Sequence, residues 1–236
     1  LWSAADEQRR PAQDPPELQR ADPQPTVLDL AQWGAGLGED LDWLEPPPKP
    51  LFQEGQQQLK QLKLLTDQGQ ITAAGQQVAA FGMHPRLGLM LIQAKRWRLE
   101  ALACDLAALL SERDLPGSRD LGCDIGHRLQ RLRDTAHSNR HDGLGSMRQQ
   151  SRQWQRQLHG INPPEAQLPL NDPEDLAVAR LIATAFPEWL ALARSGRPGA
   201  FLLRQGRGAL MPTSDPLCSA EALAIARLDL KERDAR

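Results

Sequence analysis

The chain has 236 residues, of which 40% are hydrophobic and 25% charged, and this balance is typical of a globular protein with one large or two small domains. No apolar run approaches the ~20 residues that a membrane-spanning helix needs, and the first ten residues lack the apolar stretch of a signal peptide. Cys104, Cys123 and Cys218 form no C-x-x-C pair. This spacing favours free thiols in a reducing cytoplasm over a disulfide framework.

The formal net charge of -2 hides an uneven distribution of charged residues. Residues 1–57 carry 4 basic and 11 acidic groups, a balance of -7, whereas residues 86–159 carry 13 basic and 8 acidic groups, a balance of +5. A basic middle segment is compatible with binding a polyanion. A set of solvated helix faces would give the same composition, and composition alone favours that alternative.

The first third of the chain has the signals of a small helical domain after a proline-rich, charged connector over residues 1–25. A helix stopped by Gly34 is followed by a proline corner, a second helix, a tight turn, a short strand and a third helix with Thr72 as its N-cap. The predicted ranges are 26–33 and 51–65 for the first two helices, 46–48 for the corner, 66–69 for the turn, 70–71 for the strand and 73–81 for the third helix. This order is that of a degenerate winged helix, although many small helical domains share it.

The middle of the chain is strongly helical. Residues 87–113 predict one helical stretch, and its second half is apolar nearly all round and should be buried. Helical spacing of leucines returns over residues 125–136 and is followed by a polar loop at 137–146 with two glycines. These segments predict a helical bundle.

The helix that follows the loop carries three arginines on one side. Its predicted inner face is formed by Met147, Ser151, Trp154 and Leu158. Its outer face presents Arg148, Arg152 and Arg156, one turn apart, with no acidic residue between positions 143 and 159. Arginine rows of this kind can pair with phosphates, but a solvated outer face is the more common meaning of the pattern.

Toward the end of the chain the pattern changes from helix to strand. A helix is predicted to start at 172–175, where the sequence DPED places an N-cap, a first-turn proline and two acids in order, and to run to Ala185 with a restart after Pro187. Residues 200–211 then predict a β-hairpin, and 223–230 a strand or a short helix.

Signatures of catalysis and metal binding are missing from the sequence. It has no G-x-x-x-x-G-K-[ST] phosphate loop and no Asp-Glu-x-His tetrad for magnesium. His137 and His141 stand four residues apart, but in a polar loop without a cysteine partner. His84 precedes a helix start and is better explained as a capping or packing residue. We therefore expect no catalytic residue, no metal site and no cofactor in this chain.

Six stretches of the sequence form a distinctive series: PELQRAD (16–22), VLDLAQWG (27–34), WLEPPP (43–48), LKLLTDQGQITAAGQQVAAFGMHPRLGLML (62–91), ALACDLAALLSERD (101–114) and FLLRQGRGALM (201–211). Together they resemble the helicase-associated region of DEAH-box helicases, and above all that of the bacterial HrpB subfamily. The subfamily assignment rests mainly on 101–114, which general DEAH helicases lack in that form. At 96–99 the sequence RWRL stands where the family has an LGLG-like turn.

The resemblance implies a mainly α fold in which a degenerate winged helix precedes a helical-bundle ratchet domain and the start of a β-rich C-terminal domain. The implied parts are a connector from the second RecA-like domain at 1–25, the winged helix at 26–90, the ratchet domain at 91–195 and the β-rich start at 196–236. ATP and Mg2+ are expected only in motor domains outside this chain.

The resemblance also implies a role in gripping single-stranded nucleic acid, RNA rather than DNA, together with the motor domains of an ATP-dependent helicase. The residues expected to contact the strand are Arg86, Lys95, Arg113, Arg148, Arg152 and Arg156. The alternative is a free-standing winged-helix module that binds nucleic acid or protein without a motor. A phosphate loop encoded upstream of Leu1 would distinguish the two, and a cytoplasmic location is expected in both cases.

Overall fold

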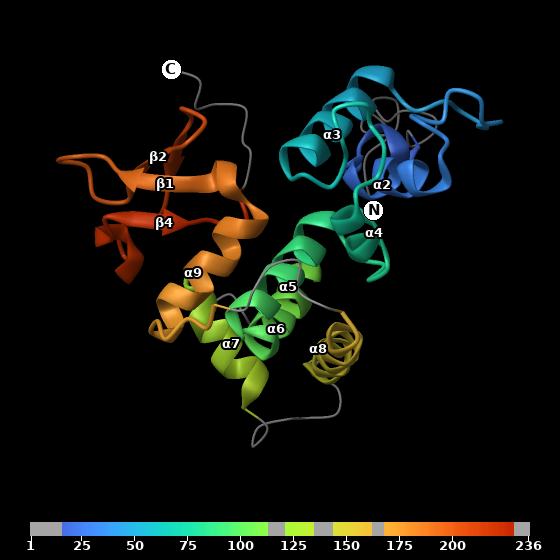
Figure 1. The fold of residues 1–236 in the computed structure, drawn as a ribbon. Helices are drawn as coiled ribbons and strands as arrows, with labels where there is room; N and C mark the ends of the chain where they lie inside the picture. Colours follow the sequence, from blue (N-terminus) through green and yellow to red (C-terminus); the bar gives the residue numbers. More distant parts are fainter. Residues whose placement is uncertain (1–15, 113–120, 135–143, 162–167, 229–236) are drawn as a thin grey trace, which may run out of the picture. The chain divides into compact units, whose positions relative to one another are not determined.

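The computed structural model describes residues 16–112, 121–134, 144–161 and 168–228, and the chain divides into two compact units, one up to Ala79 and one from Ala80 onward (Figure 1). The helices are α2 (Gln24–Trp33), α3 (Lys49–Gln61), α4 (Ala73–Ala79), α5 (Pro85–Trp97), α6 (Glu100–Ser111), α7 (Ile125–Arg133), α8 (Leu144–His159) and α9 (Glu174–Ala185), with the short 3-10 helices η1 (Glu17–Gln19), η3 (Pro187–Trp189) and η4 (Pro216–Ser219). The strands are β1 (Leu190–Ala193), β2 (Ala200–Leu203), β3 (Gly208–Leu210) and β4 (Ala222–Ala224). The fold is mainly helical with a small sheet, as predicted. Across these described ranges, no helix is long and apolar enough to cross a membrane.

In the first unit, α2 packs against α3 and α4. The apolar side chains that the helical spacing places inward are buried, among them Val27 and Leu30 of α2, Phe52 and Leu59 of α3, and Val78 of α4. Each exposes 1% of its surface or less, so the unit has a dry core of its own. The predicted order of helix, helix and helix is therefore present.

The ends of α2 and α3 follow the glycine and proline signals of the sequence. Gly34 closes α2 with φ 76°, and its N–H bonds to the carbonyls of Leu30 and Ala31. Glycine adopts this left-handed conformation without a steric penalty. After the proline corner, α3 begins directly behind the extended Pro48, so Pro50 lies in its first turn instead of preceding the helix.

The turn between α3 and α4 also matches its prediction. Gly69 ends the turn with φ 83°. Leu65, before the turn, and Ile71, after it, form a single antiparallel bridge. The Thr72 hydroxyl then accepts a hydrogen bond from the Gly75 N–H at 3.0 Å, which is the predicted N-cap of α4. The predicted short strand is thus reduced to one bridge.

In the second unit, the stretch predicted as one helix over 87–113 is two helices, α5 and α6. Arg98 adopts a left-handed conformation with φ 58°, and the Leu99 N–H reaches back to the Ala94 carbonyl at 2.9 Å. This is the hydrogen bond of a Schellman helix end. Because apolar residues recur on both sides of the break, their spacing alone does not reveal it.

Helix α6 is the central helix of the second unit and contacts α5, α7, α8 and α9 (Figure 1). Its buried residues are Leu102, Ala103, Cys104, Leu106, Ala107, Ala108 and Leu109. They cover most of the helix circumference, which confirms the predicted burial of this segment. A helix that is apolar nearly all round is stable in water only when other helices surround it.

The starts of α8 and α9 differ in detail from the predictions. Helix α8 begins at Leu144, inside the segment 137–146 that was expected to be a loop. Helix α9 begins at Glu174, but the Asp172 side chain does not cap it. The Asp172 carboxylate instead forms an ion pair at 2.7 Å with Arg180, which lies nearly two turns into the helix.

The sequence analysis expected a helix to restart after Pro187, and the structure corrects this expectation. The chain forms one 3-10 turn there and then enters β1. The four strands pair antiparallel in the order β3-β2-β1-β4, with Leu192 opposite Leu202 on one side and Ala222 on the other. The predicted hairpin is β2 and β3, and β4 shows that the segment near 223 is a strand.

The sheet has one buried and one exposed face, since successive side chains of a strand alternate. Ala191, Phe201 and Leu203 form its small core. On the other face Leu192 is 67% exposed and Leu210 is 74% exposed. Sheet and helices meet where β4 contacts α9.

Asp215, just before η4, provides a second link between the sheet region and the helices. Its carboxylate accepts hydrogen bonds from the N–H groups of Cys123 at 2.7 Å and Leu217 at 3.0 Å. The hydrogen bond from Cys123 holds the pKa of Asp215 below its usual value. The buried carboxylate thus fixes the segment that leads into α7.

Candidate nucleic-acid interface

Helix α8 has one buried and one exposed face because its apolar residues recur every three or four positions. Met147, Trp154 and Leu158 each expose 5% of their surface or less, and the helix packs mainly against α6. This confirms the predicted inner face. Arg152 and Arg156 lie on the other side of the helix and are exposed.

The exposed side of α8 contains a shallow, open hollow of about 520 Å³. It is lined by Gln149, Arg152, Gln155, Arg156 and His159. No carboxylate lines it, and no ion pair joins either arginine to another side chain in the described part of the chain. The hollow therefore offers a ligand two guanidinium groups, two amides and one imidazole.

Arg148, the third arginine of the predicted row, binds inside the unit. Its Nε donates to the Leu132 carbonyl at 2.6 Å, and its Nη2 donates to the Asp134 carbonyl at 2.9 Å. These carbonyls lie at the C-terminal end of α7, where the helix itself supplies no donors. Arg148 thus caps α7, and the outer face keeps two of the three predicted arginines.

Lys95 has a similar position at the end of α8. Its Nζ donates to the carbonyl of Leu158 and, at 3.3 Å, to that of His159. A cation at a helix C-terminus is also favoured by the helix dipole. Lys95 therefore joins α5 to the end of α8, at the backbone of His159, whose side chain lines the hollow.

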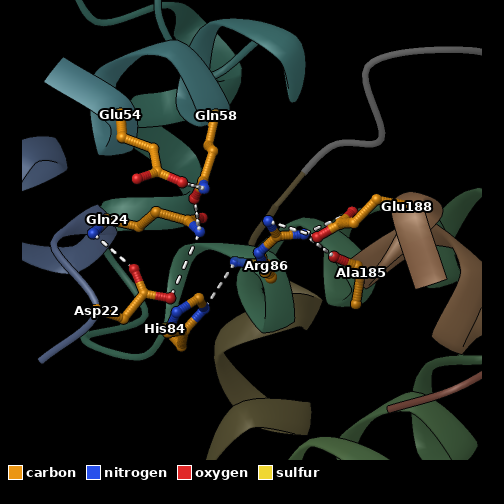
Figure 2. Close-up of polar contacts among 8 residues, drawn as sticks. All are labelled: Asp22, Gln24, Glu54, Gln58, His84, Arg86, Ala185 and Glu188. Carbon is orange, nitrogen blue, oxygen red and sulfur yellow. Dashed lines mark hydrogen bonds and ion pairs between the residues drawn. The ribbon is translucent and has the colours of Figure 1, made fainter. Parts of the chain in front are cut away.

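Arg86 is buried at the end of α9, with 7% of its surface exposed (Figure 2). Its Nη1 donates to the Ala185 carbonyl at 2.9 Å, and its Nη2 lies 2.8 Å from Glu188 Oε1. The guanidinium also lies over the Phe186 ring, 5.6 Å from the centroid. Its own backbone N–H donates to His84 Nδ1, so His84 is the predicted N-cap of α5.

The six residues expected to contact the strand therefore separate into three groups. Arg86, Lys95 and Arg148 are engaged by carbonyl groups at helix ends. Arg113 lies outside the described residues. Arg152 and Arg156 line the hollow together, and Arg156 Nε also donates to the Arg152 carbonyl at 3.4 Å.

Sequence reasoning missed the other members of the hollow, which are Gln149, Gln155 and His159. Each stands three or four residues from Arg152 or Arg156, which places it beside an arginine on the same helix face. The helical spacing that places the two arginines on the outer face places these three residues there as well.

No metal site is visible in the ranges that the structure describes, and the thiol of Cys104 is buried. No group of three His, Cys, Asp or Glu side chains there could hold a metal ion. The two histidines that stand four residues apart, His137 and His141, lie outside the described residues. Burial raises the pKa of the Cys104 thiol from 9.0 to about 12, so this cysteine is a packing residue.

No family model matches the chain, but its sequence is similar to parts of known ATP-dependent RNA helicases. A probable ATP-dependent RNA helicase of Saccharomyces cerevisiae is 32% identical over 115 residues, which cover 49% of this chain and 16% of that protein. A pre-mRNA-splicing factor ATP-dependent RNA helicase of Schizosaccharomyces pombe is 31% identical over 96 residues, or 41% of this chain and 8% of that protein. The chain is thus homologous to a segment of this class of helicase.

Within that class, the similarity to HrpB extends over nearly the whole chain. The ATP-dependent RNA helicase HrpB of Escherichia coli is 31% identical over 216 residues, which cover 92% of this chain and 24% of that protein. Two crystal structures of E. coli HrpB superimpose with TM-scores of 0.72 and 0.73, at 29% and 26% identity over 94% and 99% of this chain. The chain is a homologue of a segment of HrpB, and it spans about a quarter of the length of that relative.

Proposed function

We propose that this chain is the accessory region of an HrpB-type ATP-dependent RNA helicase that grips single-stranded nucleic acid while motor domains outside the chain move the strand. Homology to HrpB over 92% of the chain supports this role. The observation that carries the contact surface is the hollow on α8, in which Arg152 and Arg156 are exposed and no acid is present.

In this proposal the parts of the chain have separate roles. Residues 26–90 form a degenerate winged helix that connects the motor to a ratchet domain at 91–195, and 196–236 begin a β-rich domain. ATP and Mg2+ bind to the motor domains, and the protein acts in the cytoplasm. The order of elements in the first unit and the helices around α6 are compatible with these roles.

The two exposed arginines are suited to a phosphate backbone. Because they are four residues apart, the helical rise separates their backbone positions by about 6 Å along the axis. A guanidinium group binds phosphate through parallel N–H donors. Contacts of this kind fix the position of a strand without reading its bases. Binding should therefore depend on salt and vary little with base sequence.

The test is a double variant, Arg152→Ala with Arg156→Ala, titrated with labelled single-stranded RNA at several salt concentrations. Each lost phosphate contact lowers the slope of log affinity against log salt by about 0.7, so the double variant should lower it by about 1.4. The affinity loss should be similar for all homopolymers. Circular dichroism should be unchanged, because both arginines are exposed.

The matched control removes the same charge elsewhere. Arg204 and Arg207 are exposed in the turn between β2 and β3, so Arg204→Ala with Arg207→Ala alters the net charge equally. This control should leave the salt slope near that of the unchanged chain. If both double variants behave alike, the attraction is a property of net charge and the hollow is not a contact surface.

The alternative remains a free-standing module that binds nucleic acid or protein without a motor. The helicase proposal expects a phosphate loop and an Asp-Glu-x-His tetrad in the reading frame upstream of Leu1. It also expects the chain by itself to show no ATPase activity, with or without RNA. Steady ATP turnover by the purified chain above a heat-inactivated control would contradict both hypotheses.

A further inference from the structure

A chain of hydrogen bonds connects the hollow on α8 to the interior of the second unit. Gln155 Nε2 donates to Ser151 Oγ at 3.2 Å, and Ser151 Oγ donates to Asp105 Oδ1 at 2.7 Å. The other oxygen of Asp105 accepts from Arg133 Nε at 3.0 Å. Ser151 exposes 2% of its surface, so its hydroxyl is shielded from solvent.

This chain fixes the orientation of the Gln155 amide. A carboxylate paired with an arginine only accepts hydrogen bonds, so the Ser151 hydroxyl must give its single hydrogen to Asp105. The Ser151 oxygen can then only accept, and the group that donates to it is the NH2 of Gln155. The amide nitrogen is therefore directed inward to Ser151, and Oε1 of Gln155 is left as an acceptor at the hollow.

A fixed acceptor is an unexpected feature of a surface that binds phosphate. The guanidinium groups of Arg152 and Arg156 supply donors, which match the oxygens of a phosphate. A phosphodiester has no hydrogen to give to Gln155 Oε1. A ribose has such a hydrogen on its 2′-hydroxyl, close to the phosphate, whereas a deoxyribose does not. This hydroxyl is the group by which proteins distinguish RNA from DNA.

We propose that Gln155 is a specificity residue that selects RNA over DNA by accepting a hydrogen bond from a ribose 2′-hydroxyl, while Arg152 and Arg156 hold the neighbouring phosphates. This inference rests on the proposed function, since it requires that the hollow bind a nucleic-acid backbone. Ser151 is a positioning residue, because it acts on the ligand through the amide that it orients.

The experiment compares two uridine oligonucleotides of equal length, one with ribose and one with 2′-deoxyribose, so that the 2′-hydroxyl is the sole difference. The purified chain should bind the ribose oligonucleotide about three- to tenfold more tightly, as expected for one hydrogen bond. Gln155→Met keeps the length of the side chain and removes the acceptor. It should weaken binding of the ribose oligonucleotide by that factor and leave the deoxyribose oligonucleotide unaffected.

Two further variants show where the effect comes from. Gln153→Met, on an exposed position of α8 outside the hollow, is the matched control and should change neither affinity. Ser151→Ala frees the Gln155 amide to rotate, so it should lower the preference for ribose without reaching that of Gln155→Met. Circular dichroism of each variant checks that α8 is retained.

The possible failures can be told apart. Equal affinity of the unchanged chain for both oligonucleotides, or equal weakening of both by Gln155→Met, would overturn the role of Gln155 and leave the arginine contacts standing. If the double variant of Arg152 and Arg156 binds both oligonucleotides as well as the unchanged chain does, the hollow is not a nucleic-acid site. The proposed function of the hollow and the inference would then fail together.

Discussion

Basic side chains act differently in two regions of the second unit, the C-terminal ends of three helices and the outer face of α8. At the helix ends, Arg86, Lys95 and Arg148 donate to the terminal carbonyls of α9, α8 and α7. On the outer face, Arg152 and Arg156 are exposed around an acid-free hollow. The last carbonyls of a helix lack intrahelical donors and therefore compete with an external phosphate for the same cations. A basic residue in a sequence thus predicts a donor without identifying its acceptor.

The largest effect in this comparison is expected at Arg86. Arg86→Met should lower the free energy of unfolding by about 2–4 kcal/mol, because Glu188 would keep a half-buried charge without a partner and the Ala185 carbonyl would lose its donor. Urea denaturation measures the loss. Binding of single-stranded RNA, per folded molecule, should not change.

Arg86→Lys is the control for geometry, because it keeps the charge but cannot form the two-pronged contact with Glu188. Its loss of stability should be smaller than that of Arg86→Met. If Arg86→Met left the stability unchanged and weakened RNA binding, the comparison would be contradicted, and Arg86 would be a strand contact.

Arg148 and Arg152 give a matched pair of medium effect, since they stand one turn apart on the same helix. Arg148→Met should lower the free energy of unfolding by about 1–2 kcal/mol through the loss of two hydrogen bonds to α7. Arg152→Met should change it by less than about 0.5 kcal/mol, as is usual for an exposed position. The salt slope of RNA binding should respond in the opposite way, falling by about 0.7 for Arg152→Met alone. Similar changes for both variants in either measurement would contradict the different roles of the helix ends and the outer face of α8.

The smallest effect tests how well α6 is shielded from solvent, through the pH dependence of the Cys104 thiol. The folded chain keeps this thiol protonated up to a pKa of about 12, whereas the unfolded chain releases its proton above the ordinary value of 9.0. The resulting stability is present below pH 9 and is lost as pH rises toward 12. Between about pH 9 and pH 10 the unchanged chain should lose about 1 kcal/mol more than Cys104→Ala does. Parallel pH profiles for the two proteins would show that the thiol is not desolvated.

Much of the fold could be predicted from the sequence because its signals are local. The inner face of α8, the glycine that stops α2 and the Thr72 cap of α4 were all predicted and are confirmed. The break between α5 and α6 was missed, because Arg98 has no compositional mark of a left-handed residue. The helix predicted after Pro187 was wrong, because the pairing of β1 with both β2 and β4 outweighs the helical signal of the segment.

The candidate site was predicted only in part, because some of its features depend on contacts between side chains that are far apart in the sequence. The sequence placed Arg152 and Arg156 opposite the buried face, and that required only helical periodicity. It could not show that the Gln155 amide is oriented by Ser151 and Asp105, since Asp105 lies on another helix and 46 residues away from Ser151.

By itself, the sequence determined which apolar residues of the helices are buried, where most helices begin and end, and which family the chain resembles. These properties depend on neighbours within a few residues or on residue identity alone. The tertiary structure decided which cations are free to bind a ligand. The carbonyls that engage Arg148, Lys95 and Arg86 lie 16, 63 and 99 residues away along the chain, and only the packing of the helices brings them within hydrogen-bond distance.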